Sequence, residues 1–267
     1  MWPIERRLRR MIEPHGRSGP PAKSRPSARS LCGRWALLRR RVCLLRHGEV
    51  AYFGDSGKRL AADEVLLTAA GVQQARAAGR ALAELRFDRV ITSGLPRTVQ
   101  TARLVVEQSE RIAHDLAPES WPDLHELRPG DASEIPDDEL EDAFLGPFRG
   151  RPAPSAAYLN GETVGSLMTR VGGAMDRLFA DHGWDTILLV LHGGVNRAIL
   201  SWALAGTGHL FAQFEQSPGC INIIDGEPGL FVVRAVNLTP NERLHDRRTT
   251  TVETIFEQYR AHRKAIC

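Results

Sequence analysis

The sequence predicts a three-layer α/β/α sandwich, in which helices cover both faces of a mainly parallel central sheet. Short apolar runs without helical periodicity alternate along the chain with longer segments whose apolar residues recur every three or four positions, a pattern typical of strand–helix–strand units. Hydrophobic residues make up 42% of the 267 residues and charged residues 25%, which excludes a fibrous or wholly disordered chain. No apolar stretch approaches the ~20 residues that a membrane span needs, so we expect no membrane association.

The first half of the main segment predicts two strand–helix pairs. The apolar run 42–45 predicts a buried strand with an exit loop at Arg46-His47-Gly48. Thr68 has the character of an N-cap, and it precedes apolar positions at helical spacing. Residues 88–92 predict a second strand, and Pro96 fits the first turn of the helix after it, where a missing N–H costs little.

The second half continues the alternation. The elements expected there, in order, are a third strand and a polar loop in 111–135, a surface excursion with one short acidic helix in 136–160, a helix at 164–179, a strand at 186–191 with a helix after it, a hairpin of strands near 219–225 and 229–236, and a C-terminal helix in the last ~20 residues. These elements complete the predicted sheet and its two helical layers.

Residues 1–41 differ from the rest of the chain in charge. They hold twelve Lys and Arg against two Glu, whereas residues 42–267 hold 23 Lys and Arg against 30 Asp and Glu. We expect a mostly disordered basic extension, because this segment has almost no apolar periodicity with which to offset the entropy of ordering. Three interpretations stay open: an arm that binds nucleic acid or anionic lipid, a targeting peptide, and upstream sequence included by a wrong start, which we favour.

Cysteine usage indicates a reducing compartment. The four cysteines are far apart and form no Cys-x-x-Cys pair: Cys32, Cys43, Cys220 and Cys267. This spacing argues against a zinc knuckle and against a disulfide scaffold. We therefore expect a cytoplasmic protein.

Two predicted strands each end in a histidine that is followed by glycine. These are His47 with Gly48 and His192 with Gly193. Open α/β sheets bind ligands at the carboxyl ends of their strands, and glycine lets backbone N–H groups approach an anion closely. A single histidine in such a place is more often an ordinary polar residue, so the repetition carries the hypothesis.

Two arginines accompany the histidines. Arg46 stands beside His47, and Arg97 lies in the first turn of the helix after the second strand. Arg97 alone is more often a surface or ion-pair residue. Two imidazoles, two guanidiniums and helix N-termini at one edge of a sheet indicate a binding site for a tetrahedral dianion.

Four sequence blocks carry a resemblance to a known family. They are LLRHGE at residues 44–49, LTAAGVQQA at 67–75, TSGLPRTVQTA at 92–102 and VLHGG at 190–194. In order and spacing they resemble the signature of the histidine phosphatase superfamily, the phosphoglycerate mutase-like proteins, over about residues 42–236. The resemblance implies a phosphoglycerate mutase-like fold for residues 42–267 and leaves the basic extension outside it.

The resemblance also implies roles for the site residues. His47 is the implied nucleophile, which forms a phosphohistidine, since a neutral imidazole is competent near pH 7. Arg46, Arg97, His192 and Gly193 are implied to hold the phosphoryl oxygens. Phosphoryl transfer depends mostly on positioning and electrostatics, so these groups predict a reaction without metal or other cofactor.

A proton donor is also needed for the leaving alkoxide. Glu126 matches the family's usual position for the acid, in a loop after the third strand. Three neighbouring acids compete with it: Glu119, Asp123 and Asp131. We favour Glu126, with reach to the phosphate as the criterion.

The remaining polar candidates have weaker assignments. Glu49 is expected to shape the first loop rather than to act as the acid. Ser93 has two open roles, as a donor to phosphate or as a helix cap. The other histidines are expected at the surface or in local hydrogen bonds, with His125 set apart because it adjoins Glu126; they are His114, His125, His182, His209, His245 and His262.

Three functions remain after these assignments. Mutases of the resembled family usually follow the first motif with a stretch that holds Trp and Asn, and residues 49–55 contain neither. A mutase also needs extra cations for a phosphoglycerate carboxylate, and residues 129–160 supply only Arg149 and Arg151. We therefore predict a metal-independent phosphatase for a small phosphorylated metabolite. A phosphoglycerate mutase is the alternative and a non-catalytic phospho-ligand binder the third possibility; nucleic acid is expected only at the basic extension, and we predict no oligomeric state.

Overall fold

The computed structural model describes residues 39–53, 60–61, 64–109, 116–206, 211–241 and 248–266. The chain divides after Leu38, and the fold described below is that of the second unit, Arg39–Cys267. Most of the predicted basic extension therefore lies outside the described residues. The same holds for three of the histidines considered above, His114, His209 and His245.

A six-stranded sheet with the order β3-β2-β4-β1-β5-β6 forms the centre of this unit. The strands are β1 (Arg40–Arg46), β2 (Arg89–Thr92), β3 (Glu119–Ser120), β4 (Thr186–Leu191), β5 (Ile221–Glu227) and β6 (Leu230–Leu238). The first four strands in the sheet order pair in parallel, whereas β5 pairs antiparallel with both of its neighbours. The prediction of a mainly parallel sheet is confirmed.

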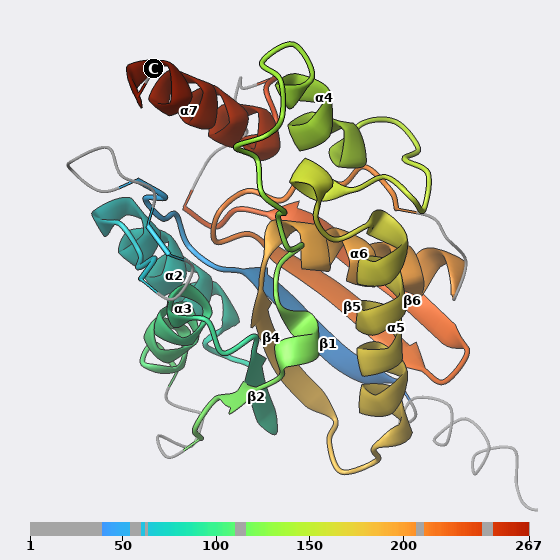
Figure 1. Cartoon of the computed structure of the whole chain (residues 1–267). Helices are drawn as coiled ribbons and strands as arrows, with labels where there is room; N and C mark the ends of the chain where they lie inside the picture. Colours follow the sequence, from blue (N-terminus) through green and yellow to red (C-terminus); the bar gives the residue numbers. More distant parts are fainter. Residues whose placement is uncertain are drawn as a thin grey trace, which may run out of the picture. The chain divides into compact units, whose positions relative to one another are not determined.

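Helices cover both faces of the sheet (Figure 1). Their bounds are α2 (Ala69–Leu82), α3 (Pro96–Val106), α4 (Leu140–Leu145), α5 (Val164–Ala180), α6 (Gly193–Ala205) and α7 (Thr251–Ile266), with 3-10 turns η2 (Pro122–Leu124), η3 (Gly146–Phe148) and η4 (Tyr158–Asn160). Helices α2 and α3 pack on one face, and α5 and α6 on the other. Within the described residues, no helix is both long and apolar enough to cross a membrane.

Strand β1 shows how the sequence pattern produces the two cores. Val42 and Leu44 belong to the core under α5 and α6, while Cys43 and Leu45 belong to the core under α2 and α3. Alternate side chains of a strand point to opposite faces, so a strand that is buried on both sides is a continuous apolar run. The strand begins at Arg40, two residues earlier than the sequence predicts.

The starts of α2 and α3 have the expected chemistry. Thr68 caps α2, since its hydroxyl accepts the N–H of Gly71 at 3.1 Å, and Pro96 is the first residue of α3. The third predicted strand is reduced to two residues, β3. The hairpin turns between β5 and β6 close to the predicted position.

The prediction of a surface excursion over residues 136–160 needs correction. The short acidic helix is present as α4, but its segment builds a third small core with α7. Phe144 and Leu159 are buried there against Phe256. Acidic residues dominate the composition of this segment, so its buried apolar side chains cannot be recognised from the sequence alone. They become buried because α7 packs beside α4 (Figure 1).

Two glycines allow the loop after β1 to pass close to α2. A Cβ on Gly48 would lie 2.3 Å from the carbonyl oxygen of Gly71, and a Cβ on Gly71 would lie 2.1 Å from that of Glu49. Neither distance is compatible with a side chain, because backbone atoms stand at both points. This approach holds the first motif against the helix.

The Gly71→Ala variant is therefore expected to lower the free energy of unfolding by about 1–3 kcal/mol. The matched control is Gly173→Ala in α5, where the nearest atom to the new Cβ is Arg177 Nη1 at 3.9 Å. There we expect an increase of about 0.5–1 kcal/mol, because alanine favours the helix. Denaturant unfolding measures both, and the same sign in the two variants would contradict the close approach.

Candidate active site

The two motif histidines meet at the carboxyl ends of two adjacent strands. In the parallel pairing of β1 with β4, Arg46 lies opposite Leu191, so the residues that follow, His47 and His192, lie side by side. Their ring centroids are 5.3 Å apart with the rings at 69°. Both side chains are buried, with 2% and 0% of their surface exposed. The structure thus brings the two imidazoles to one point.

Arg46 and Arg97 lie buried beside the histidines. Arg46 ends β1 and donates through Nη1 to the carbonyl oxygen of Gln216, while its buried Nε has no hydrogen-bond partner among the described residues. Gly193 begins α6 against the same guanidinium, with an added Cβ only 3.5 Å from Nε. A buried donor of this kind at a helix N-terminus is suited to an anion oxygen.

His47 is held in one tautomer. Its Nδ1 lies 2.7 Å from the carbonyl oxygen of Gly48, which can only accept, so Nδ1 carries the proton and Nε2 keeps its lone pair. Burial lowers the pKa of His47 well below the ordinary value of 6.5, and the charges of Arg97 and Arg46 lower it further. The ring is therefore neutral near pH 7, with the lone pair of Nε2 not protonated.

His192 is held by a serine. Its Nε2 lies 2.8 Å from the hydroxyl of Ser93, and its buried Nδ1 has no hydrogen-bond partner within the described part of the chain. Burial lowers the pKa of His192 as well, followed by the charge of Arg97. Ser93 also accepts the N–H of Leu95 at 3.3 Å. The hydroxyl also lies 3.1 Å from that of Thr98, so Ser93 contacts both His192 and the first turn of α3.

These lowered pKa values predict how stability depends on pH. The unfolded chain has histidines of ordinary pKa, near 6.5, so below that pH it binds more protons than the folded chain does. The free energy of unfolding should therefore fall as the pH drops below 6.5, by up to about 1.4 kcal/mol per pH unit and histidine, and these two groups should contribute no slope above it. Denaturant unfolding in phosphate-free buffer between pH 7.5 and 5 tests this, with His47→Gln expected to have the smaller slope; equal slopes would refute it.

Glu126 lies next to this group at the N-terminus of α6. Its Oε2 accepts the N–H of Gly194 at 3.1 Å, and its Oε1 accepts the N–H of Leu127 at 2.9 Å. Arg170 supports the loop from behind, donating to the backbone carbonyl of Glu126 at 3.2 Å. The carboxylate thus stands at the N-terminus of α6, bound to Gly194, which is two residues along the chain from His192.

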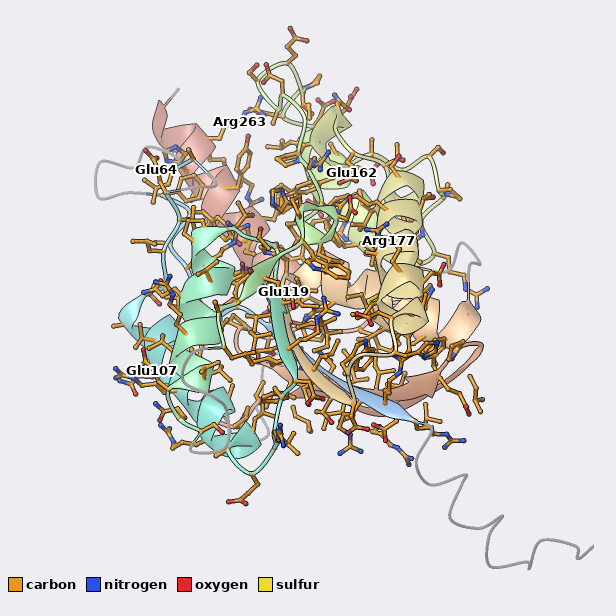
Figure 2. All side chains as sticks on the ribbon, turned by 90° about the horizontal axis from the view of Figure 1, so that it is seen from below. Glu64, Glu107, Glu119, Glu162, Arg177 and Arg263 are labelled. Carbon is orange, nitrogen blue, oxygen red and sulfur yellow. The ribbon has the colours of Figure 1, made fainter. Side chains whose placement is uncertain are left out.

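The three competing acids are engaged elsewhere. Glu119 on β3 pairs with Arg89 at 2.6 Å, and Asp123 pairs with Arg177 on α5; Figure 2 shows Glu119 and Arg177 on these elements. Asp131 accepts from Ser133. None of the three lines the cavity described next, as far as the described residues define it.

Glu49 and His125 lie at the margins of the site. The carboxylate of Glu49 accepts the hydroxyl of Thr68 at 3.0 Å and its N–H donates to Gln74 at 2.8 Å, which is a loop-shaping position. His125 lines the cavity beside Glu126, and burial lowers its pKa. Its hydrogen bond with the backbone of Ser93 agrees with the expected local role, and its place beside Glu126 agrees with setting it apart from the other histidines.

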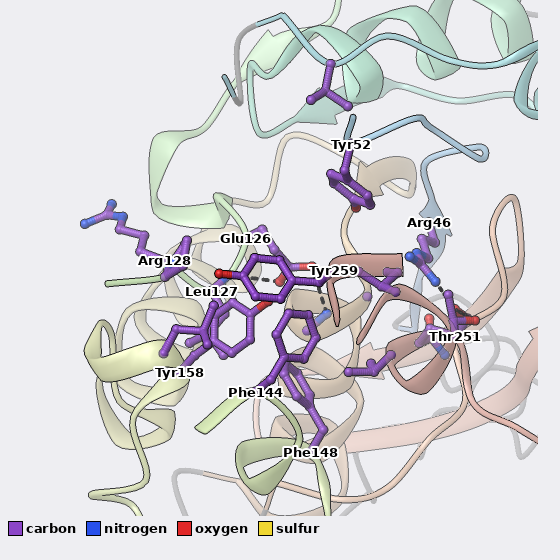
Figure 3. Close-up of a pocket in the computed structure, with 18 of the residues that line it drawn as sticks. Arg46, Tyr52, Glu126, Leu127, Arg128, Phe144, Phe148, Tyr158, Thr251 and Tyr259 are labelled. Carbon is purple, nitrogen blue, oxygen red and sulfur yellow. Dashed lines mark hydrogen bonds between the residues drawn. The ribbon is translucent and has the colours of Figure 1, made fainter. Parts of the chain in front are cut away.

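A cavity of about 280 Å³ opens from these groups toward α4 and α7. Figure 3 shows its aromatic side chains gathered around Glu126. Four of them form what we term the aromatic wall: Phe144, Phe148, Tyr158 and Tyr259. Two charged residues that the sequence analysis did not single out, Arg197 and Glu215, also line it.

A second cavity of about 640 Å³ adjoins the first. It contains His47 and is lined on its outer side by hydroxyl-bearing residues, including Thr68, Ser217 and Thr250. The two cavities share six lining residues: Arg46, Tyr52, Phe53, Glu215, Thr251 and Ile255. Arg46 therefore lies where the two cavities join, with Arg97 in the wall of the first and His47 in the wall of the second.

A phosphate-binding α/β enzyme is the class that this fold and site define. The chain belongs to the histidine phosphatase superfamily, branch 1, whose family model matches residues 42–239. It is 30% identical over 199 residues to the adenosylcobalamin/alpha-ribazole phosphatase of Salmonella typhimurium, which covers 74% of this chain and 96% of that protein. It is 28% identical over 169 residues to the uncharacterized phosphatase PhoE of Bacillus subtilis, covering 63% of this chain and 80% of that one.

Solved structures agree with this assignment. The crystal structure of the alpha-ribazole phosphatase from Shigella flexneri superposes with a TM-score of 0.59 at 28% identity, over 77% of this chain and 100% of that chain. A phosphoglycerate mutase from Bacillus anthracis, at 20% identity and a TM-score of 0.59 over 75% and 93% of the two chains, shares the fold. The chain is thus an enzyme that hydrolyses phosphate esters, as the sequence predicts.

Proposed function

We propose that this enzyme hydrolyses a small phosphomonoester in two steps through a phosphohistidine on His47, without a metal ion. The observation that carries the proposal is the meeting of two buried imidazoles, with ring centroids 5.3 Å apart, beside the buried guanidiniums of Arg46 and Arg97. Two fixed, buried positive charges supply the electrostatic stabilisation that phosphoryl transfer needs.

In the first step His47 attacks the phosphorus. The lone pair on Nε2 forms the N–P bond while the bond from phosphorus to the alcohol oxygen breaks. Arg46, Arg97 and His192 hold the three non-bridging oxygens as charge redistributes. Ser93 donates to Nε2 of His192 in the tautomer that leaves a proton on Nδ1, so that Nδ1 can donate to one of those oxygens.

Glu126 moves the proton in both steps. In its protonated form it gives a proton to the leaving alkoxide, and the resulting carboxylate then takes a proton from the water that attacks the phosphohistidine. The second step breaks the N–P bond, releases inorganic phosphate and returns His47 and Glu126 to their starting states. The place of Glu126 at the start of α6, next to His192, supports this assignment.

The two cations that the sequence offered for a phosphoglycerate carboxylate lie outside the cavity wall. Arg149, one of the two cations expected for a phosphoglycerate carboxylate, pairs with Glu141 at 2.9 Å and is half exposed. Neither Arg149 nor Arg151 lines the cavity within the described residues. The relatives at 28–30% identity are also named as phosphatases.

Turnover of p-nitrophenyl phosphate in the presence of a chelator tests this proposal. We expect the wild type to release phosphate at the same rate with and without the chelator, because arginines carry the charge that a metal would otherwise supply. Loss of activity on chelation would refute the metal-independent route. With 3-phosphoglycerate as substrate, movement of phosphate to the 2-hydroxyl faster than its release would establish the mutase instead.

A further inference from the structure

The reaction geometry determines which of the two cavities receives the alcohol. In phosphoryl transfer the attacking and leaving atoms stand on opposite sides of the phosphorus, roughly in line. In the described part of the chain, His47 lines the larger cavity and not the aromatic one, whereas Glu126 lines the aromatic one and not the larger. If His47 is the nucleophile and Glu126 the acid, as proposed above, the alcohol lies in the aromatic cavity.

The aromatic wall indicates a flat, apolar group on that alcohol. Phe144 meets Tyr158 with ring centroids 5.2 Å apart at 74°, and Tyr158 meets Phe148 at 5.6 Å and 78°. Tyr259 of α7 packs on Phe144 at 5.7 Å. Edge-to-face packing fixes the orientation of these rings before a ligand binds. Such a preformed surface fits a planar ring.

A polar pair interrupts this apolar lining. Arg197 lies one helical turn beyond Gly193 on α6, with 4% of its surface exposed. Its Nε donates to the carbonyl of Phe214 at 2.7 Å and its guanidinium lies 5.5 Å from the centre of the Phe148 ring. Its buried Nη1 has no hydrogen-bond partner among the described residues. The side chain that lines the cavity thus has a buried donor without a partner, about 6 Å along the helix axis from Gly193.

Glu215 supplies the matching acceptor. Its Oε1 accepts the N–H of Thr251 at 3.1 Å, while its buried Oε2 lies 3.9 Å from Arg197 Nη2 and has no hydrogen-bond partner in the described chain. Buried polar groups without partners are unfavourable, so this donor and acceptor together call for a ligand group. A hydroxyl both donates and accepts; a carboxylate would be repelled by Glu215 and an ammonium by Arg197.

We propose that the substrate is the phosphate monoester of an alcohol that carries a flat apolar ring and a second hydroxyl, and that Arg197 and Glu215 bind this hydroxyl. The inference rests on the proposed function, because it uses the same phosphate site and the same acid. It assigns Arg197 and Glu215 as specificity-determining residues. It also means that short phosphorylated acids should be poorer substrates than esters with a ring and a second hydroxyl.

The test compares two esters that differ only in hydroxyls, adenosine 5′-monophosphate and its 2′,3′-dideoxy analogue, with p-nitrophenyl phosphate as a ring without a hydroxyl. We expect the wild type to prefer the hydroxylated nucleotide at least about tenfold in kcat/KM, since a site built to bond a hydroxyl discriminates strongly against its absence. In Arg197→Met, and independently in Glu215→Gln, the preference should fall to about one. Arg149→Met, which removes an arginine outside the cavity wall, should keep it.

The outcomes separate this inference from the proposed function. Equal kcat/KM for the two nucleotides in the wild type, with p-nitrophenyl phosphate hydrolysed through His47, would overturn the hydroxyl site and leave the phosphatase proposal intact. A preference that persists in both Arg197→Met and Glu215→Gln would also overturn it. Absence of hydrolysis of all three esters by the wild type would instead overturn the phosphatase proposal, and the inference with it.

Discussion

The His47→Ala variant is expected to lose about 10⁴-fold or more in kcat for p-nitrophenyl phosphate. Removing a covalent nucleophile leaves only the binding groups, which stabilise the ester but offer no atom to form the first bond. Arg46, Arg97 and His192 would still bind the phosphate, so KM should change far less than kcat. Steady-state rates measure the loss, and acid-free quenching of wild type with ³²P-labelled ester should show label on His47.

The neighbouring histidine provides the matched control. His192→Ala removes an imidazole from the same buried pocket, yet in the proposed mechanism that ring only stabilises charge. Losing one such donor costs about 10²–10³-fold, so His192→Ala should be slower than wild type and still become labelled on His47. A His47→Ala protein that keeps more than a hundredth of the activity, or label found on His192, would contradict the assignment.

The parallel sheet explains why the phosphate end of the site can be predicted from sequence. Arg46, His47 and His192 each follow an apolar run that reads as a buried strand. Parallel strands present their carboxyl ends at one edge, so the residues that follow them must come together whatever the loops do. The pairing of Arg46 with Leu191 in the β1–β4 ladder places His47 and His192, the next residues, side by side.

The alcohol end of the site has no comparable signal. Arg197 stands within a helix, where an arginine ordinarily occupies the solvated face, and it is buried only because the chain at Phe148 and Glu215 folds over it. Phe144 lies in an acidic segment that reads as surface. Its inward direction depends on Tyr259 and the rest of α7 docking from the far end of the sequence. Contacts between segments without shared periodicity leave no trace in the pattern of either one.

Glu126 falls between these two cases. The family resemblance suggests that the acid follows β3. The position of its carboxylate, however, depends on contacts with residues that lie far away in the sequence. Arg170 on α5 reaches the carbonyl of Glu126 and is itself held by Glu162 at 2.6 Å. Gly194 completes the support from α6, with so little room that a Cβ there would lie 2.5 Å from the carboxylate. A loop held from two helices can present an acid reproducibly.

The Glu126→Gln variant should reveal this acid through its dependence on the leaving group. For an ester of an ordinary alcohol, such as glycerol 2-phosphate, we expect kcat/KM to fall about 10²–10⁴-fold, because the alkoxide must be protonated as it leaves. For p-nitrophenyl phosphate the fall should be much smaller, since p-nitrophenolate is stable without a proton. The ratio kcat/KM includes only steps up to release of the alcohol, so it reports the acid role separately from the later activation of water.

Glutamine keeps the size of the side chain and can still accept the N–H of Gly194, which limits structural effects of the substitution. Glu119→Gln is the matched control: the same exchange seven residues earlier, in a carboxylate that pairs with Arg89 outside the cavity wall of the described chain. It should change kcat/KM for neither ester. Equal losses for both esters in Glu126→Gln would mean that this carboxylate does not protonate the leaving group. The acid would then have to come from water or from another titratable side chain of the cavity wall, such as His125.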